Sequence, residues 1–135
     1  MSVFLEKSTQ SIAAAKKIVK ESYYASTVNR SYYGCVHFMM YIIFVKIKKD
    51  KTDFYSDVRN GNDGTHTWAA KIIENELAHN VTQEKVYKWF QVEIKSLRKL
   101  RVLGDYHDYV VSQSDAYRSI DTAETIINNL KKAFK

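Results

Sequence analysis

Apolar residues recur every three or four positions along most of the chain, which is the spacing of amphipathic helices. In the first segment, Ser2 is placed to cap a helix whose apolar stripe is Phe4, Leu5, Ile12, Ala15, Val19 and Tyr23. No segment shows the alternation of period two that is typical of a half-buried strand. We therefore predict an all-α fold, an up-and-down bundle of four to five helices, in one domain over residues 1–135.

The same periodicity places the other helices and the connections between them. After a break near residues 24–26, helices are predicted from about Thr27 to Lys49, from about Thr65 to Ala78, from about Asn80 into the segment Arg101–Tyr109, and after Ser114. Asn80 to Gln83 matches a capping box, which marks the start of the fourth helix. Residues 50–64 are rich in Asp, Asn and Gly, a composition that favours a loop. The inward residues of these helices are expected to include Trp68, Ile72, Ile73, Leu77, Val86, Phe90, Leu97, Ala116, Ile120, Ala123, Ile127 and Leu130.

The second helix is apolar nearly all round. Its main stripe is Val28, Tyr32, Cys35, Val36, Met39 and Ile43, and its other faces carry Tyr33, Phe38, Tyr41 and Phe44. Such a helix lies either at the centre of a bundle or against a second chain. Because burial on all sides is difficult for one helix of so small a domain, we expect a homodimer.

The composition is that of a globular protein with excess positive charge. Hydrophobic residues make up 45% and charged residues 27% of the chain, and no proline interrupts its helices. The net charge of +6 favours an anionic partner, such as nucleic acid, a membrane surface or an acidic protein. Cys35 is the single cysteine, so no disulfide can form within the chain. Because the longest apolar run, residues 36–45, is too short to cross a membrane, we expect a cytoplasmic protein without a membrane partner.

No metal or cofactor motif occurs in the sequence. It lacks HExxH, CxxC, a glycine-rich phosphate loop and a Gly-x-Ser-x-Gly elbow. The histidines His37, His66, His79 and His107 lie in separate segments, which leaves only a metal site shared between two subunits as an alternative. We therefore predict neither a metal nor a cofactor. His66 is interpreted as a capping or loop histidine at the start of the third helix.

The segment Arg101–Tyr109 is the strongest candidate for chemistry. An arginine offers a planar fork of donors to a phosphate, and His107 can move a proton near neutral pH. On a regular helix these two side chains point about 120° apart, so they converge only if the helix bends near Gly104 or if both border a groove. Arg101 and Asp105 have the spacing of an i,i+4 pair. The alternative is therefore a surface ion pair, with His107 in solvent.

A second cluster of polar and aromatic residues occurs early in the second helix. Tyr32 and Tyr33 are adjacent and precede Gly34, which predicts tight packing against another helix. Arg30 is expected to pair with Asp105 and so to link the second helix to the fourth. We prefer this structural role for the pair.

Lysines near the end of the second helix form a basic run. Lys46 and Lys48 are interpreted either as a patch that contacts phosphates or as a solvated helix end, where cations suit the helix dipole. With Arg30, they are the candidate substrate-binding residues.

Together these motifs resemble the signatures of HEPN (higher eukaryotes and prokaryotes nucleotide-binding) domains. The segment Asn29-Arg30-Ser-Tyr32-Tyr33-Gly resembles the signature nRxYYa, and Leu100-Arg101-Val-Leu-Gly-Asp105-Tyr106 resembles lRxxaDY. Thr65-His66 lies where members often have a histidine at the start of the third helix. The resemblance extends over residues 4–133 and implies a small helical bundle, frequent homodimers, and roles in toxin–antitoxin and phage-defence systems.

The resemblance also implies roles for particular residues. Active members are metal-independent ribonucleases with an Arg-x(4–6)-His motif at the dimer seam, and Arg101 and His107 match that spacing. Arg101 would then neutralise the scissile phosphate, and His107 would act as general base or acid on the ribose 2′-hydroxyl or the leaving oxygen. Many members have a nucleotidyltransferase partner, an antitoxin that can modify a tyrosine beyond the motif with AMP, and Tyr109 is the matching residue. The structural motif would consist of Tyr32, Tyr33, Asp105 and Tyr106.

The sequence leaves three functions open. The first is a ribonuclease-type toxin or defence component that acts as a homodimer. The second is a non-catalytic HEPN module that binds nucleotide, RNA or a nucleotidyltransferase partner. Val102 favours this second function, because active members usually have Asn, Asp or His directly after the arginine. The third is a dimeric helical scaffold whose basic charge is incidental.

Overall fold

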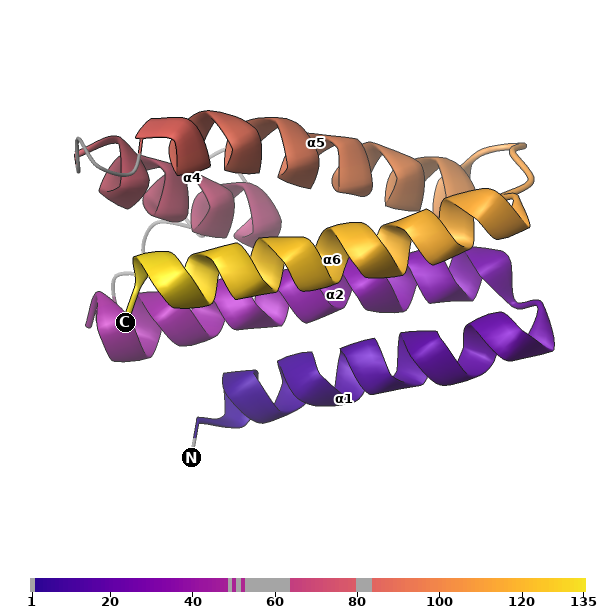
Figure 1. Ribbon diagram of the computed structural model, residues 1–135, viewed down its shortest axis with the longest axis horizontal. Helices are drawn as coiled ribbons and strands as arrows, with labels where there is room; N and C mark the ends of the chain where they lie inside the picture. The colour runs from indigo at the N-terminus through magenta and orange to yellow at the C-terminus, as the bar shows by residue number, and fades with distance from the viewer. Residues whose placement is uncertain (1, 49, 51, 53–63, 80–83) are drawn as a thin grey trace.

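The computed structural model describes residues 2–48, 50, 52, 64–79 and 84–135, and these residues form a bundle of helices without a strand (Figure 1). The α-helices are α1 (Val3–Ile18), α2 (Tyr24–Tyr41), α4 (Thr65–Ala78), α5 (Glu84–Tyr106) and α6 (Gln113–Ala133). A 3-10 turn, η1 (Val19–Glu21), extends α1, and a π turn, η2 (Ile42–Lys46), extends α2. The predicted all-α bundle is therefore confirmed.

Two of the predicted helix boundaries at the ends of α2 are wrong. The break after α1 falls at Ser22, whose φ of 66° is left-handed, so α2 begins at Tyr24 rather than at Thr27. The helical turns end at Lys46, and the left-handed φ of 64° at Lys48 is incompatible with a longer helix. The predicted end, Lys49, lies outside the described residues.

The later boundaries agree more closely with the sequence. α4 has the predicted bounds, and the predicted capping box at residues 80–83 lies outside the described residues. α6 begins at Gln113, slightly earlier than predicted, because the Ser112 hydroxyl accepts a hydrogen bond of 3.0 Å from the Asp115 amide and so caps the helix. α5 ends at Tyr106, so residues 107–109 of the candidate segment Arg101–Tyr109 follow the helix.

α2 is the central helix of the bundle and contacts each of the other α-helices. Figure 1 shows α1 along one side of it, α6 beside it, and the pair α4 and α5 on the other side. This position explains why α2 is apolar nearly all round. Because the chain itself covers the helix, this apolar pattern does not require a second chain, and the homodimer stays a prediction.

The core confirms most of the inward residues predicted from the sequence. Its buried side chains include Tyr32, Phe38, Met39, Trp68, Ile73, Leu77, Phe90, Leu97, Ala123, Ile127 and Leu130. Ile72 and Val86 are partly buried against this cluster. In the parts of the chain that the structure describes, no helix has the length and hydrophobicity to span a bilayer.

The α1–α2 pair is packed unusually closely at Gly34. A Cβ atom there would lie 2.5 Å from Ile12 Cδ1, so a side chain at this position would require the Ile12 side chain to move. The Ser8 hydroxyl donates a buried hydrogen bond of 2.7 Å to the Gly34 carbonyl. This contact fixes the register of α1 on α2, and with it the position of the polar side chains along their shared edge.

Candidate nucleotide-binding site

Arg101 is the most unusual side chain of the bundle, because its charged group is packed among aromatic rings. The residue is only 7% exposed. Its guanidinium carbon lies 5.1 Å from the ring centre of Tyr32 and 5.7 Å from those of Tyr33 and Tyr106. Such cation–π contacts hold the cation in place without using its hydrogen-bond donors.

Few polar groups compensate this buried cation. Asp105 forms the predicted i,i+4 ion pair with it, at 3.6 Å between Nη1 and Oδ2. The Arg101 Nε atom is buried and has no hydrogen-bond partner in the described part of the chain. A buried donor without a partner costs free energy that a bound anion would recover.

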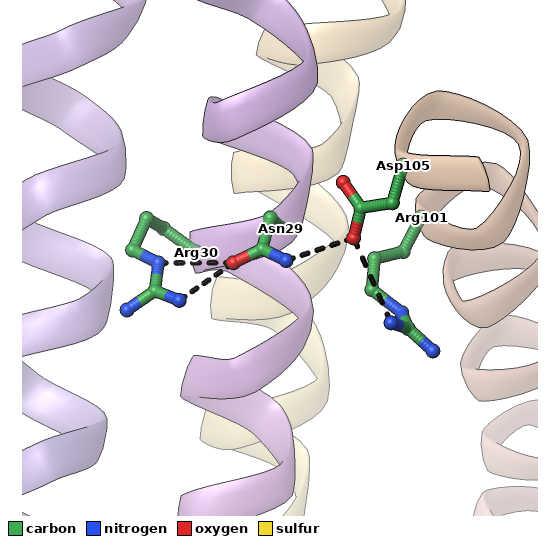
Figure 2. A network of polar contacts seen from close by, with 4 residues as sticks. All are labelled: Asn29, Arg30, Arg101 and Asp105. Carbon is green, nitrogen blue, oxygen red and sulfur yellow. Dashed lines mark hydrogen bonds and ion pairs between the residues drawn. The ribbon is translucent and has the colours of Figure 1, made fainter.

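Asn29 links Arg30 to Asp105, so the predicted direct pair between these two residues is wrong (Figure 2). The Asn29 amide nitrogen donates to Asp105 Oδ2 at 2.9 Å. Its oxygen accepts from Arg30 Nε at 3.1 Å and from Arg30 Nη2 at 2.6 Å. An asparagine can bridge in this way because its amide carries both donors and an acceptor. The predicted link between the second and fourth helices therefore exists, but Asn29 makes it.

The histidine in contact with the tyrosines around Arg101 is His66, not His107. The His66 ring lies edge-on to Tyr32 and Tyr33, with ring centres 5.3 Å and 5.2 Å apart. It occupies the first turn of α4, so the interpretation as a capping or loop histidine is wrong. The sequence did carry a signal, because His66 lies on the same helical stripe as the buried residues Ala69 and Ile73. We call Arg101, Tyr32, Tyr33 and His66 the Arg101 cluster.

The electrostatics of the cluster favour the neutral forms of His66 and Tyr32. Burial lowers the pKa of His66, and the positive charges of Arg101 and Arg98 lower it further, so the ring is neutral at pH 7. Burial raises the pKa of Tyr32 to about 12, which keeps its phenol protonated. Arg98 is held by a hydrogen bond of 3.0 Å from Nη1 to the Thr67 hydroxyl, which connects α5 to α4. The site therefore carries a net positive charge beside a neutral imidazole.

His107 lies in a different environment. It follows the end of α5 and is exposed, and its backbone amide donates to the Leu103 carbonyl at 3.3 Å. Tyr109, further along, is 41% exposed and donates a hydrogen bond of 3.0 Å from its hydroxyl to Asp115 Oδ2. That hydrogen bond, with the charge of the Asp115 carboxylate, raises the pKa of the Tyr109 phenol.

Lys46 and Lys48 are far from the Arg101 cluster. Both are exposed and lie at the end of α2 opposite to Arg30, roughly 20 Å away along the helix axis. The structure therefore does not bring these lysines together with Arg30 and Arg101.

A small cavity of about 180 Å³ borders the cluster between α4 and α5. Its lining includes Tyr32, His66, Thr67, Glu74, Lys95 and Arg98. The lining is mainly basic, and burial raises the pKa of its one described carboxyl group, Glu74. Elsewhere too, the described residues contain no group of three or more His, Cys, Asp or Glu side chains placed to hold a metal ion.

Comparison with known proteins identifies the family of the chain. The family model described as HEPN domain matches residues 1–133. Searches of curated proteins and of solved structures gave no match. The matched range includes the two motifs Asn29–Gly34 on α2 and Arg101–Tyr106 on α5, which meet in the Arg101 cluster. The chain belongs to the HEPN domain family.

Proposed function

We propose that the protein binds RNA or nucleotides, with a phosphate group held at the Arg101 cluster. The observation that supports this most strongly is the buried Arg101 guanidinium, whose Nε has no hydrogen-bond partner among the described residues and whose Nη1 lies 3.6 Å from Asp105 Oδ2. A phosphate offers the paired acceptors that such a fork of donors matches. Arg98 and the net charge of +6 add long-range attraction for a polyanion.

The tyrosines give the site a means to hold a base as well as a phosphate. Tyr33 is partly exposed, and the guanidinium carbons of Arg30 and Arg101 lie 5.6 Å and 5.7 Å from its ring centre. An aromatic ring beside phosphate-binding cations is the usual arrangement of a single-stranded RNA surface. The cavity between α4 and α5 supplies further space beside His66.

A second candidate function is a metal-independent ribonuclease, and the neutral His66 beside Arg101 favours it. A neutral imidazole can take the proton of a ribose 2′-hydroxyl, whose oxygen then bonds to phosphorus while the bond to the 5′-oxygen breaks. The leaving 5′-oxygen receives a proton from a second group, and Arg101 neutralises the charge on the phosphate. His107 is the other candidate for general acid or base. Its exposed position past the end of α5 suits a homodimer in which it faces the partner's cluster.

The ribonuclease candidate includes a role as toxin or defence component with a nucleotidyltransferase as antitoxin. In that case Tyr109 is the residue that receives AMP. Its partly exposed hydroxyl supports this assignment, and the Asp115 carboxylate to which it donates is placed to accept its proton as the phenol oxygen attacks the nucleotide α-phosphate and pyrophosphate leaves.

The test is binding and cleavage of a short single-stranded RNA in the presence of EDTA. Fluorescence anisotropy should give a dissociation constant that rises about tenfold in Arg101→Lys, because lysine keeps the charge but loses the planar fork. Arg118→Lys, an exposed arginine of α6, is the matched control and should bind as the unmodified protein does. Equal affinity of the Arg101→Lys and Arg118→Lys variants would contradict the binding site.

The same samples separate binding from catalysis. Cleavage that is abolished by His66→Gln or His107→Gln, with RNA affinity unchanged, supports the ribonuclease and identifies its histidine. Binding without any cleavage leaves the non-catalytic module as the function.

A further inference from the structure

A basic pocket lies between α1 and α2, beside Arg30. Its volume is about 390 Å³, and it is lined by Lys7, Gln10, Ser11, Ala14, Arg30 and His37. The four residues from α1 have the spacing i, i+3, i+4 and i+7, so they form one face of that helix. No carboxylate occurs among its described lining residues. The close approach of α1 and α2 at Gly34 holds these two basic edges together.

His37 contributes a buried polar atom that lacks a partner. Its Nδ1 atom is buried and makes no hydrogen bond within the described residues. The ring is fixed from both sides, since Phe4 stacks on it at 6.4 Å between ring centres and Tyr33 lies 6.1 Å away. A protonated His37 would donate from this nitrogen to an anion in the pocket.

Among the described groups, the charges that act on His37 are the cations Lys7 and Arg30. Burial lowers its pKa most, and Lys7 from α1 and Arg30 from α2 lower it further, whereas no carboxylate acts in the opposite direction among the described groups. His66 from α4 contacts the same Tyr33 ring, and the charge of His37 helps to lower the pKa of His66. An anion between Lys7 and His37 would remove this repulsion, which makes the pocket suited to a phosphate.

Arg30 is oriented for a ligand in the pocket and is also close to the Arg101 cluster. Its Nε and Nη2 atoms donate to Asn29, and these two bonds fix the plane of the guanidinium, while Nη1 makes no hydrogen bond within the part of the chain that the structure describes. Its carbon lies 5.6 Å from the Tyr33 ring, and Arg101 lies 5.7 Å from the same ring. Two cations, one belonging to each site, therefore lie beside the Tyr33 ring.

We propose that Lys7, Arg30 and His37 form a second phosphate site, which holds a neighbouring phosphate of the single-stranded RNA bound at the Arg101 cluster. The base between the two phosphates stacks on Tyr33. This inference rests on the proposed function, because the first phosphate occupies the Arg101 cluster. With both sites occupied, the bound RNA extends from α5 across α2 to α1.

The test compares a ligand that occupies one site with a ligand that occupies two. Uridine 5′-monophosphate and a single-stranded hexauridylate are titrated against Lys7→Ala, with Lys17→Ala, another exposed lysine of α1, as the control. Lys7→Ala should weaken hexauridylate binding about three- to tenfold and reduce the slope of log affinity against log salt by about one. It should leave the affinity for the mononucleotide unchanged, and Lys17→Ala should change neither.

The outcomes separate this inference from the proposed function. If Lys7→Ala binds hexauridylate as tightly as Lys17→Ala while Arg101→Lys weakens both ligands, the second site is wrong and the Arg101 site stands. If Arg101→Lys also changes neither affinity, the proposed function itself is wrong.

Inorganic phosphate provides a readout that needs no RNA. Phosphate should raise the pKa of His37 measured by NMR, and the rise should be smaller in Lys7→Ala. A His37 titration that is the same with and without phosphate would overturn the second site.

Discussion

His66 lies near Arg101 in the fold, whereas His107 lies near it in the sequence. These two histidines have contrasting surroundings. His66 is partly buried against Tyr32 and Tyr33, in contact with the rings that also cover Arg101. His107 follows Arg101 closely in the chain but lies past the end of α5, in the exposed segment His107–Val110. The comparison shows that packing between α4 and α2, rather than spacing along α5, selects the histidine of the Arg101 cluster.

The difference between these regions should appear most strongly in stability. Tyr32 is 1% exposed and Val110 is 90% exposed. We expect Tyr32→Ala to lower the free energy of unfolding by about 3–5 kcal/mol, because it leaves a cavity beneath Arg101. Val110→Ala should change it by less than about 0.5 kcal/mol. Urea unfolding followed by circular dichroism measures both, and similar losses would mean that the cluster is not the packed region.

A second contrast concerns the partly exposed Tyr33 and the exposed Tyr109. If a base stacks on Tyr33, Tyr33→Leu should weaken binding of single-stranded RNA by about 1–3 kcal/mol, whereas Tyr33→Phe should retain most of the affinity. Tyr109→Leu, in the exposed segment, serves as the matched control. Anisotropy titrations would contradict the stacking role if Tyr33→Leu and Tyr109→Leu lost the same affinity.

The partly buried histidines should also make stability depend on pH. Because the folded pKa values of His66 and His37 are below the usual value, the unfolded chain binds more protons just below about pH 6.5. The free energy of unfolding should therefore be highest above that pH and fall as the pH decreases toward the folded pKa values. His66→Gln should make this dependence shallower by up to one proton. An identical slope in His66→Gln and in the unmodified protein would contradict this contribution of His66.

The smallest expected effect concerns Asn29, which links Arg30 of α2 to Asp105 of α5. Asn29→Ala removes the hydrogen bonds to Arg30 and Asp105 and should destabilise the fold by about 1 kcal/mol. Asn128→Ala, an exposed asparagine of α6, is the control. A loss no larger than that of the control would show that the bridge holds neither arginine in place.

Local patterns in the sequence predicted the fold well. The helical period located every described α-helix, and the bounds of α4 agree with it, since each helix buries one continuous stripe. The start of α2 was wrong because Ser22, unlike a glycine, gives little sequence signal for a left-handed backbone. The central place of α2 required the packing of distant helices, which a single stripe does not determine.

The candidate site was predictable only in part. The Arg101–Asp105 pair follows from helical spacing and is confirmed. The helical stripe of α4 indicates that His66 faces inward, but its contacts and the bridge through Asn29 join segments that are far apart in the chain, so no local pattern indicates their partners. The roles of Arg101, His107 and Tyr109 in RNA chemistry stay predictions.

The central claim is that a bound nucleotide lies beside Arg101 and His66. The most direct test is an NMR titration of the histidine rings with uridine 5′-monophosphate. A phosphate at the Arg101 cluster should shift the His66 resonances and raise its pKa, with little change at His107. A response at His107 without any response at His66 would contradict the claim.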